Sequence, residues 1–253
     1  MALQLVDKLL KYIDDNSSTL ETKLDDDSKD DIDPSNILPI LYLGSGLCVP
    51  SGVEYLNALK FKIIIATRTP SRSKRIIDKC KYPKLIETIK LDVENKEEAI
   101  KVLDKVVPKC SIMVSMLPWI YHAFVAEFAL KYGKNYANTS YIQPAMKALD
   151  KKVRDAGLIF LNECGLDPGL DHIDLVNARD EAKERGGVIK SMISICGGLP
   201  KPDCNDNPLG YKFSWAPRGV FLAGKNFAEQ LLNGKKIHVA NKDLFTTKWR
   251  ESF

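Results

Sequence analysis

Two glycines between an apolar run and a helical pattern are the first residues of this sequence that could do chemistry. Gly44 and Gly46 stand in the turn 43–49, directly after the apolar run 37–43. The first glycine permits a tight strand-to-helix turn, and the second lets the backbone approach a pyrophosphate at the helix N-terminus. Val49 stands where the usual fingerprint has a third glycine, so we expect the helix to lie slightly farther from its strand. The residues that this turn offers to a nucleotide are Gly44, Ser45, Gly46 and Leu47.

The second apolar run, 61–67, ends in residues that discriminate between nucleotides. Arg68 and Thr69 follow it, and no acidic residue stands there to accept hydrogen bonds from an adenosine ribose. A guanidinium, with the Thr69 hydroxyl and Arg72 beside it, can instead pair with a 2′-phosphate. The sequence therefore predicts NADP(H) as the cofactor, and a solvated loop arginine is the alternative.

Two more strand ends complete the predicted nucleotide site. Asp92 follows the third apolar run, 85–91, where it would contact the adenine region or cap a turn. Leu117 and Pro118 follow the fourth run, 110–116, and bring backbone to the carboxyl edge of a sheet. A nicotinamide would lie at that edge.

Alternating apolar runs and helical patterns supply the elements that must position these residues. Continuous apolar strands between helices predict parallel strands that are covered on both faces, and hence a Rossmann-type doubly wound parallel sheet. Asn95 is expected to cap one of the helices. The expected strands are 37–43, 61–67, 85–91, 110–116, 135–140 and 158–163, and the expected helices are 49–60, one beginning at 71, 95–106, 120–133 and 143–157.

The composition changes twice along the chain, which predicts three segments. Residues 1–36 have the aspartate-rich composition of an acidic leader or linker. Residues 37–165 would form the Rossmann NADP-binding domain, and residues 166–253 the beginning of an α+β substrate-binding and dimerisation domain. In this last segment the expected elements are a helix over 172–185, a strand over 188–196, a helix over 220–232 and a strand over 237–240.

Composition and charge argue against several classes of protein. The net charge of +4 is spread along the chain, which argues against a nucleic-acid interface. The six cysteines form no CxxC pair and the three histidines show no zinc spacing, so we expect no metal, reduced thiols and a cytoplasmic enzyme. His122 and His172 are expected to cap or pack. Since no apolar run reaches the roughly 20 residues that span a bilayer, we expect no membrane contact.

Six motifs stand together along the chain: GSGLCVP, ATRTP, SMLPWIYH, TSYIQPAM, NECGLDPGLDH and ICGGLPKPDCNDNPLGYKFSW. Together they resemble the glutamate-forming saccharopine dehydrogenases, also called saccharopine reductases, over roughly residues 37–235. The resemblance implies an oxidoreductase of lysine biosynthesis or breakdown that uses NADP(H). Glutamate and α-aminoadipate semialdehyde would condense to an imine, and reduction of that imine would give saccharopine.

The resemblance also implies roles for individual residues. Those implied for acid–base catalysis, which imine formation and hydrolysis require, are Tyr141, Asp167 and Cys196. Those implied for the substrate pocket are Ser140, Tyr141, Asp167, Gly197, Gly198 and Trp215. Each catalytic residue has a structural alternative: a helix-entry aromatic for Tyr141, a turn carboxylate before Pro168 for Asp167, and a small buried side chain for Cys196.

Members of that family continue well beyond the matched motifs, so we expect this chain to be truncated at its C-terminus. The expected loss includes an arginine, in a Tyr-Pro-Asn-Arg-Asp motif, that grips a substrate carboxylate. Three functions therefore stay open: an active dehydrogenase, a non-catalytic NADP-binding fragment, and a related amine–aldehyde dehydrogenase such as a carboxynorspermidine type, which the GLDPG and CGGLP motifs disfavour. The implied partners are saccharopine, glutamate and α-aminoadipate semialdehyde, with a homodimer or association with a lysine–ketoglutarate reductase module left open.

Overall fold

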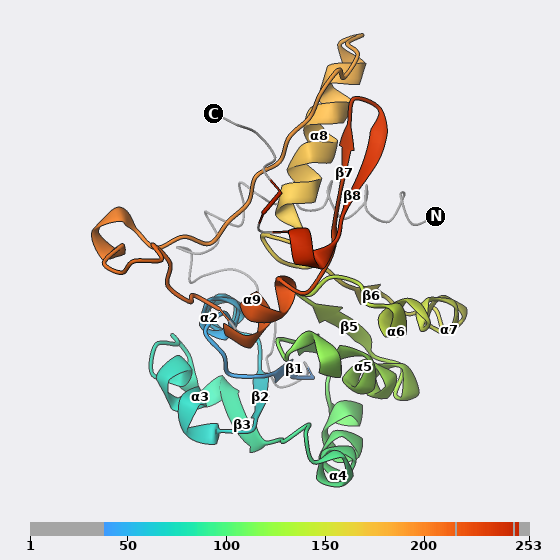
Figure 1. Ribbon diagram of the computed structural model, residues 1–253. Coiled ribbons are helices and arrows are strands. Elements are labelled where there is room, and N and C mark those ends of the chain that lie inside the picture. The colour runs from blue at the N-terminus through green and yellow to red at the C-terminus, as the bar shows by residue number, and fades with distance from the viewer. Residues whose placement is uncertain (1–37, 216, 245, 248–253) are drawn as a thin grey trace.

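A parallel six-stranded sheet forms the first part of the chain. The structure is a computed structural model that describes residues 38–215, 217–244 and 246–247. The strands are β1 (Ile40–Leu43), β2 (Ile63–Thr67), β3 (Ile86–Lys90), β4 (Ile112–Ser115), β5 (Asn135–Asn138) and β6 (Phe160–Leu161). They lie in the order β3-β2-β1-β4-β5-β6, and every neighbouring pair is parallel (Figure 1). The predicted Rossmann-type fold is confirmed.

Helices cover both faces of this sheet. They are α2 (Val49–Ala58), α3 (Pro70–Ile77), α4 (Lys96–Val106), α5 (His122–Lys131), α6 (Pro144–Lys147) and α7 (Asp150–Asp155). The expected helix over 143–157 is thus two short helices. The predicted cap is confirmed, because the Asn95 side chain accepts a hydrogen bond from the backbone N–H of Glu98 at the start of α4.

The strand pattern separates the core into two clusters, one on each face. Leu41 and Leu43 pack with Leu103 of α4 and Val125 of α5 on one side. On the other side, the alternate strand residues Ile40, Tyr42, Ile63 and Ile65 pack against side chains of the first two helices. Those side chains are Val49 and Val53 of α2 and Ile76 of α3. Because successive strand residues point to opposite faces, a strand that is apolar throughout serves both clusters.

The second part of the chain contains α8 (Leu170–Glu184), α9 (Pro217–Ala223) and an antiparallel hairpin of β7 (Ala228–Leu232) and β8 (Lys235–Val239). Its mixture of helices and antiparallel strands agrees with the predicted α+β composition. The expected acidic leader, residues 1–36, lies outside the described residues.

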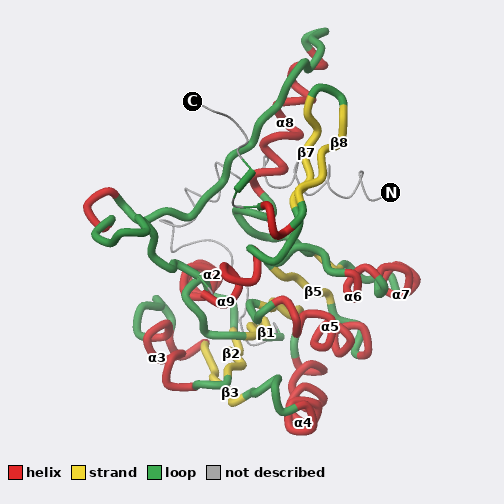
Figure 2. Tube along the Cα trace, viewed as in Figure 1, coloured by secondary structure: helices red, strands yellow, loops and turns green. Residues whose placement is uncertain are grey.

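Two predictions for this part are wrong. The expected strand over 188–196 has no strand structure: Figure 2 shows the segment as a loop that leaves α8. A strand needs a hydrogen-bonded neighbour, and the described residues provide none for this segment. The expected helix over 220–232 ends at Ala223, and β7 follows it. Asn233 and Gly234 have φ values of 51° and 74°, the conformation of a tight hairpin turn, which pairs 228–232 with 235–239 instead.

Candidate cofactor and substrate site

The glycine turn lies at the carboxyl end of β1, where the chain enters α2. Gly44 has a φ of +115°, and its N–H donates to the Ala66 carbonyl oxygen at 2.8 Å, which ties the turn to β2. A Cβ at this position would lie 3.2 Å from the Met116 carbonyl oxygen. At Gly46, by contrast, a Cβ would meet no atom within 4 Å, so one side of the turn is open. Positions 44 and 46 therefore have the strained turn and the open backbone that a pyrophosphate site needs.

Close packing of α2 on the sheet depends on a glycine that sequence reasoning missed. Val49, at the position of the third fingerprint glycine, is buried against the sheet. One turn later, a Cβ at Gly52 would collide with the Tyr42 hydroxyl. The absence of a side chain at Gly52 thus makes room for Tyr42, and glycine in a helix interior was the available signal.

The tip of β2 carries the residues that were expected to select the cofactor. Arg68 is largely exposed, and its Nη1 lies 3.2 Å from Oε1 of Glu94. Ser45 and Thr67 share a hydrogen bond of 2.7 Å between their hydroxyls, which joins the glycine turn to this tip. Thr69 precedes α3 without a capping bond from its side chain, so its hydroxyl is not used by the helix. The Thr69 hydroxyl is therefore available to an anion at this edge of the sheet, where the Arg68 guanidinium is already paired with the Glu94 carboxylate.

The remaining predicted cofactor residues lie along the same edge. Asp92 Oδ1 accepts the Glu94 N–H at 3.0 Å, so its carboxylate caps a turn, which is the structural alternative for this residue. Leu117 and Pro118 follow β4, and the Met116 N–H donates to the Leu43 carbonyl oxygen at 2.9 Å. The loop after β4 therefore runs directly beside the glycine turn.

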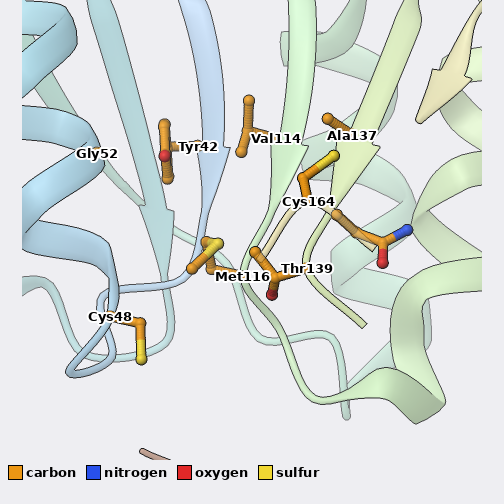
Figure 3. A pocket seen from close by; sticks show the side chains of 9 residues that line it. Tyr42, Cys48, Gly52, Val114, Met116, Ala137, Thr139 and Cys164 are labelled. Atoms are coloured by element: carbon orange, nitrogen blue, oxygen red, sulfur yellow. The ribbon is translucent and has the colours of Figure 1, made fainter. Parts of the chain in front are cut away.

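A cavity of about 350 Å³ opens between the glycine turn and the ends of β4 and β5 (Figure 3). It lies at the point where the strand order reverses between β1 and β4, which is where doubly wound folds bind ligands. The side chains and backbone that line it belong to Tyr42, Cys48, Gly52, Val114, Met116, Ala137, Asn138, Thr139 and Cys164.

Two of the three predicted catalytic residues are hydrogen-bonded to each other. The Tyr141 hydroxyl donates to Asp167 Oδ1 at 2.5 Å. Burial raises the pKa of Tyr141 well above its usual range, and the hydrogen bond to Asp167 raises it further. Tyr141 is therefore a neutral phenol that carries a proton at ordinary pH.

The third predicted catalytic residue, Cys196, lies beside the same carboxylate. Desolvation raises the pKa of its thiol, and the nearby Asp167 and Asp171 carboxylates add to the rise, with a hydrogen bond to Asp167. The thiol is thus protonated at neutral pH. The structure brings Tyr141, Asp167 and Cys196 together, while their catalytic roles stay predictions.

Two further carboxylates surround this group, and sequence reasoning did not single them out. Glu163 has a φ of +63°, and its Oε1 accepts the Ile142 N–H at 3.0 Å, which holds the loop next to Tyr141. Asp171 Oδ1 accepts the Gly169 N–H at 2.9 Å and lies 2.9 Å from His172 Nδ1. The hydrogen bond to Asp171 raises the pKa of His172. Such a concentration of negative charge suits a cationic amine, and the acidic residues of the NECGLDPGLDH motif were the available signal.

His122 connects the end of β4 to the loop that carries Ser140. Its Nδ1 lies 3.0 Å from Ser115 Oγ and 3.1 Å from the Tyr136 hydroxyl, and its Nε2 lies 2.9 Å from Ser140 Oγ. Burial lowers the pKa of His122 to about 4, so the ring is neutral. The expected packing role agrees with these contacts. The hydrogen bond with the buried imidazole holds the Ser140 side chain in place.

The other predicted pocket residues follow the long loop after α8. A Cβ at Gly198 would lie 3.5 Å from Ser214 Oγ, and a Cβ at Gly197 would meet no atom within 4 Å. Trp215 is 42% exposed and packs against Gly219. Their roles in binding substrate stay predictions.

The described residues contain no group of three or more His, Cys, Asp or Glu side chains that could hold a metal ion. Within the same residues, no helix has both the length and the apolar character needed to cross a membrane.

Two family models match the chain. The saccharopine dehydrogenase NADP binding domain matches residues 40–161, and the saccharopine dehydrogenase C-terminal domain matches residues 165–253. The second match continues past residue 235, where the motifs had suggested that the resemblance weakens, so that boundary was wrong.

Individual relatives agree with these models. The saccharopine dehydrogenase [NADP(+), L-glutamate-forming] of Schizosaccharomyces pombe is 43% identical over 209 residues, which are 82% of this chain and 45% of the relative. The mitochondrial alpha-aminoadipic semialdehyde synthase of Bos taurus is 41% identical over 199 residues, which are 79% of this chain and 21% of the relative.

A solved structure shows the same fold. The apo saccharopine dehydrogenase (L-Glu forming) of Saccharomyces cerevisiae superposes with a TM-score of 0.69 at 37% identity, over 83% of this chain and 45% of that chain. The chain thus spans less than half the length of the relatives that it matches.

Proposed function

This chain belongs to the saccharopine dehydrogenase family, and from that premise we propose that it binds NADP(H) and interconverts saccharopine with glutamate and α-aminoadipate semialdehyde. Residues 37–165 would form the NADP-binding domain, and residues 166–253 part of the substrate-binding domain. The relatives are named for this activity, but this chain spans less than half of their length. The activity of the whole enzyme is therefore proposed for this chain and not shown.

The main support for the cofactor assignment is that the open glycine turn, the cavity and Arg68 all lie at the carboxyl edge of the sheet. Gly46 leaves room beside the backbone N–H groups at the start of α2, where a pyrophosphate would bind. Arg68 and Thr69 would hold the 2′-phosphate, and Leu117 and Pro118 would lie beside the nicotinamide. When bound, NADP(H) supplies or accepts the hydride.

The proton transfers would fall to the cluster around Asp167. The Tyr141 phenol and the Cys196 thiol are protonated donors, because desolvation and the nearby carboxylates raise the pKa of both, although the Cys196 residue is exposed. Asp167 accepts from Tyr141 and would orient the secondary amine of saccharopine. Ser140, Gly197, Gly198 and Trp215 would shape the pocket around the substrate.

Two measurements test this proposal. Fluorescence titration of the purified chain with NADPH and NADH should show tighter binding of NADPH. The Arg68→Ala variant should lose affinity for NADPH by about tenfold or more, because a charge-assisted contact to phosphate is lost, while NADH binding changes little. An equal loss for both nucleotides would remove the assignment of Arg68. Turnover is then followed as NADPH absorbance with saccharopine and NADP⁺.

A second candidate function is NADP(H) binding without turnover. It is favoured by the large apolar side chains exposed along the segment after α8, such as Val188 at 84% and Leu199 at 78%. A substrate pocket built on such a segment needs further polypeptide to bury these side chains. Binding of NADPH with no formation of glutamate or aldehyde from saccharopine would favour this candidate.

The partners and the compartment also belong to the proposal. A lysine–ketoglutarate reductase module is one partner, because the chain matches a portion of the longer alpha-aminoadipic semialdehyde synthases. A homodimer is the other, and the cytoplasm is the proposed compartment. Size-exclusion chromatography with light scattering separates a monomer from a dimer.

A further inference from the structure

The Arg68 guanidinium already has an anionic neighbour, the carboxylate of Glu94. Oε1 of Glu94 lies 3.2 Å from Arg68 Nη1, within ion-pair distance, and both side chains are more than half exposed. Glu94 follows β3 and Arg68 follows β2, and these strands are adjacent in the sheet. The carboxylate therefore occupies a position at the guanidinium that the cofactor's 2′-phosphate would also seek.

Two other contacts hold Glu94 in this position. Its N–H donates to Asp92 Oδ1 at 3.0 Å, which fixes the backbone in a turn. Its Oε1 also accepts a hydrogen bond of 3.2 Å from the hydroxyl of Tyr121, the residue that directly precedes α5. The carboxylate is thus directed at Arg68 by its surroundings and is not merely a long side chain that happens to be near.

We propose that Glu94 is a specificity-determining residue, which competes with the 2′-phosphate of NADP(H) for Arg68 and thereby limits the preference for NADP(H) over NAD(H). The inference rests on the proposed function, because it takes the Arg68 guanidinium as the phosphate ligand. A phosphate that binds Arg68 must displace the Glu94 carboxylate or lie within a few ångströms of it. Both cost free energy, the first by loss of an ion pair and the second by repulsion of like charges.

Replacement of Glu94 by glutamine removes the charge and keeps the shape. An amide oxygen still accepts the hydrogen bond from Tyr121, so the local geometry has little reason to change. Since exposed ion pairs are weak, the expected gain in affinity for a 2′-phosphorylated nucleotide is about two- to fivefold. A nucleotide without this phosphate should bind Glu94→Gln and the unaltered chain equally.

If Glu94 instead supports Arg68, the change in affinity for NADPH has the opposite sign. If the carboxylate serves to hold the guanidinium in place for the phosphate, its neutralisation weakens the binding of NADPH. The direction of the change in affinity therefore decides between competition and support.

The experiment is a calorimetric or fluorescence titration of the full chain with 2′,5′-ADP, 5′-ADP, NADPH and NADH. Glu97→Gln is the matched control, because Glu97 is exposed in the first turn of α4 and its replacement removes the same charge three residues away. We expect Glu94→Gln to bind 2′,5′-ADP and NADPH more tightly, with 5′-ADP and NADH unchanged, and Glu97→Gln to match the unaltered chain.

Three results would overturn the inference: weaker or unchanged binding of 2′,5′-ADP by Glu94→Gln, an equal gain for 5′-ADP, or the same gain in Glu97→Gln. The first would assign Glu94 to support of Arg68 or to no role, and the others to a general charge effect. Failure of the proposed function gives a different pattern, because the unaltered chain would then bind neither NADPH nor 2′,5′-ADP.

Discussion

The imidazole Nε2 of His122 lies 2.9 Å from the hydroxyl oxygen of Ser140, so a buried ring in α5 fixes the loop that leads to Tyr141. The ring has hydroxyl neighbours on both nitrogens, and among the residues that the structure describes no carboxylate lies in hydrogen-bond contact with it. Burial alone therefore determines its protonation, which makes the ring a source of acid sensitivity.

The free energy of unfolding should depend on pH through His122. Burial lowers its pKa from 6.5 to about 4, so the folded state favours the neutral ring. The resulting stability is fully present above pH 6.5, and it is lost as the pH falls from 6.5 toward 4, by up to about 3 kcal/mol. Urea unfolding between these pH values measures the slope.

The matched variant for this prediction is His122→Asn, which cannot titrate in this range. It should be less stable at pH 7 by about 1–3 kcal/mol, because buried hydroxyls lose their partners. It should also lose the part of the pH slope that His122 contributes. An unchanged slope in the variant would assign the acid sensitivity to other groups.

The two glycines of the cofactor turn should respond differently to alanine. Gly44→Ala places a side chain at a φ of +115° and 3.2 Å from the Met116 carbonyl oxygen, so it should lower stability by about 1–3 kcal/mol. Gly46→Ala has open space around its Cβ and should leave the melting temperature nearly unchanged. It should still weaken NADPH binding if, as proposed, the backbone at this position contacts the pyrophosphate. Thermal melting and NADPH titration on both variants separate the two effects.

Gly52→Ala should destabilise the protein, because the new methyl group would collide with the Tyr42 hydroxyl. The expected cost is about 1–3 kcal/mol, as for other overpacked cores. Removing the hydroxyl in the double variant Gly52→Ala, Tyr42→Phe should recover much of this stability. If the double variant is as unstable as the single one, the contact between α2 and β1 is not the cause.

Removal of the Asp167 charge should lower the pKa of Tyr141. Burial is the main reason that this pKa is raised, and the Asp167 carboxylate contributes through its hydrogen bond and its charge. In Asp167→Asn the phenol should therefore titrate at lower pH than in the unaltered chain. NMR of ring-labelled tyrosine, with Tyr141→Phe to assign the signal, measures the shift. Unaltered titration would show that Asp167 does not contact the phenol in solution.

The sheet and the cofactor edge could be predicted from the sequence because their signals are local. Each expected strand of residues 37–165 is a parallel strand of the sheet, and the turn with Gly44 and Gly46 lies at the start of a helix as expected. The position of Arg68 after β2 also follows from the chain order, while its role toward the cofactor stays a prediction. In each case, neighbours along the chain determine the structure.

The missed features depend on contacts between distant segments. A strand over 188–196 requires a neighbouring strand, which no local pattern supplies. The opposition of Glu94 and Arg68 arises because two strand ends lie side by side, and the collision that Gly52 avoids involves a residue ten positions earlier. The β7–β8 hairpin could have been predicted, since Asn233 and Gly234 are a strong turn signal. The helical periodicity over 220–232 obscured that signal.

The brevity of β6 has a consequence for how copies of this molecule meet. A long, flat border strand presents a row of unsatisfied amide and carbonyl groups that can recruit another polypeptide, the first step toward aggregates. Here the edge strand β6 is only two residues long, Phe160 and Leu161. Edge-to-edge stacking through this margin gains few hydrogen bonds, even though the Leu161 side chain is exposed.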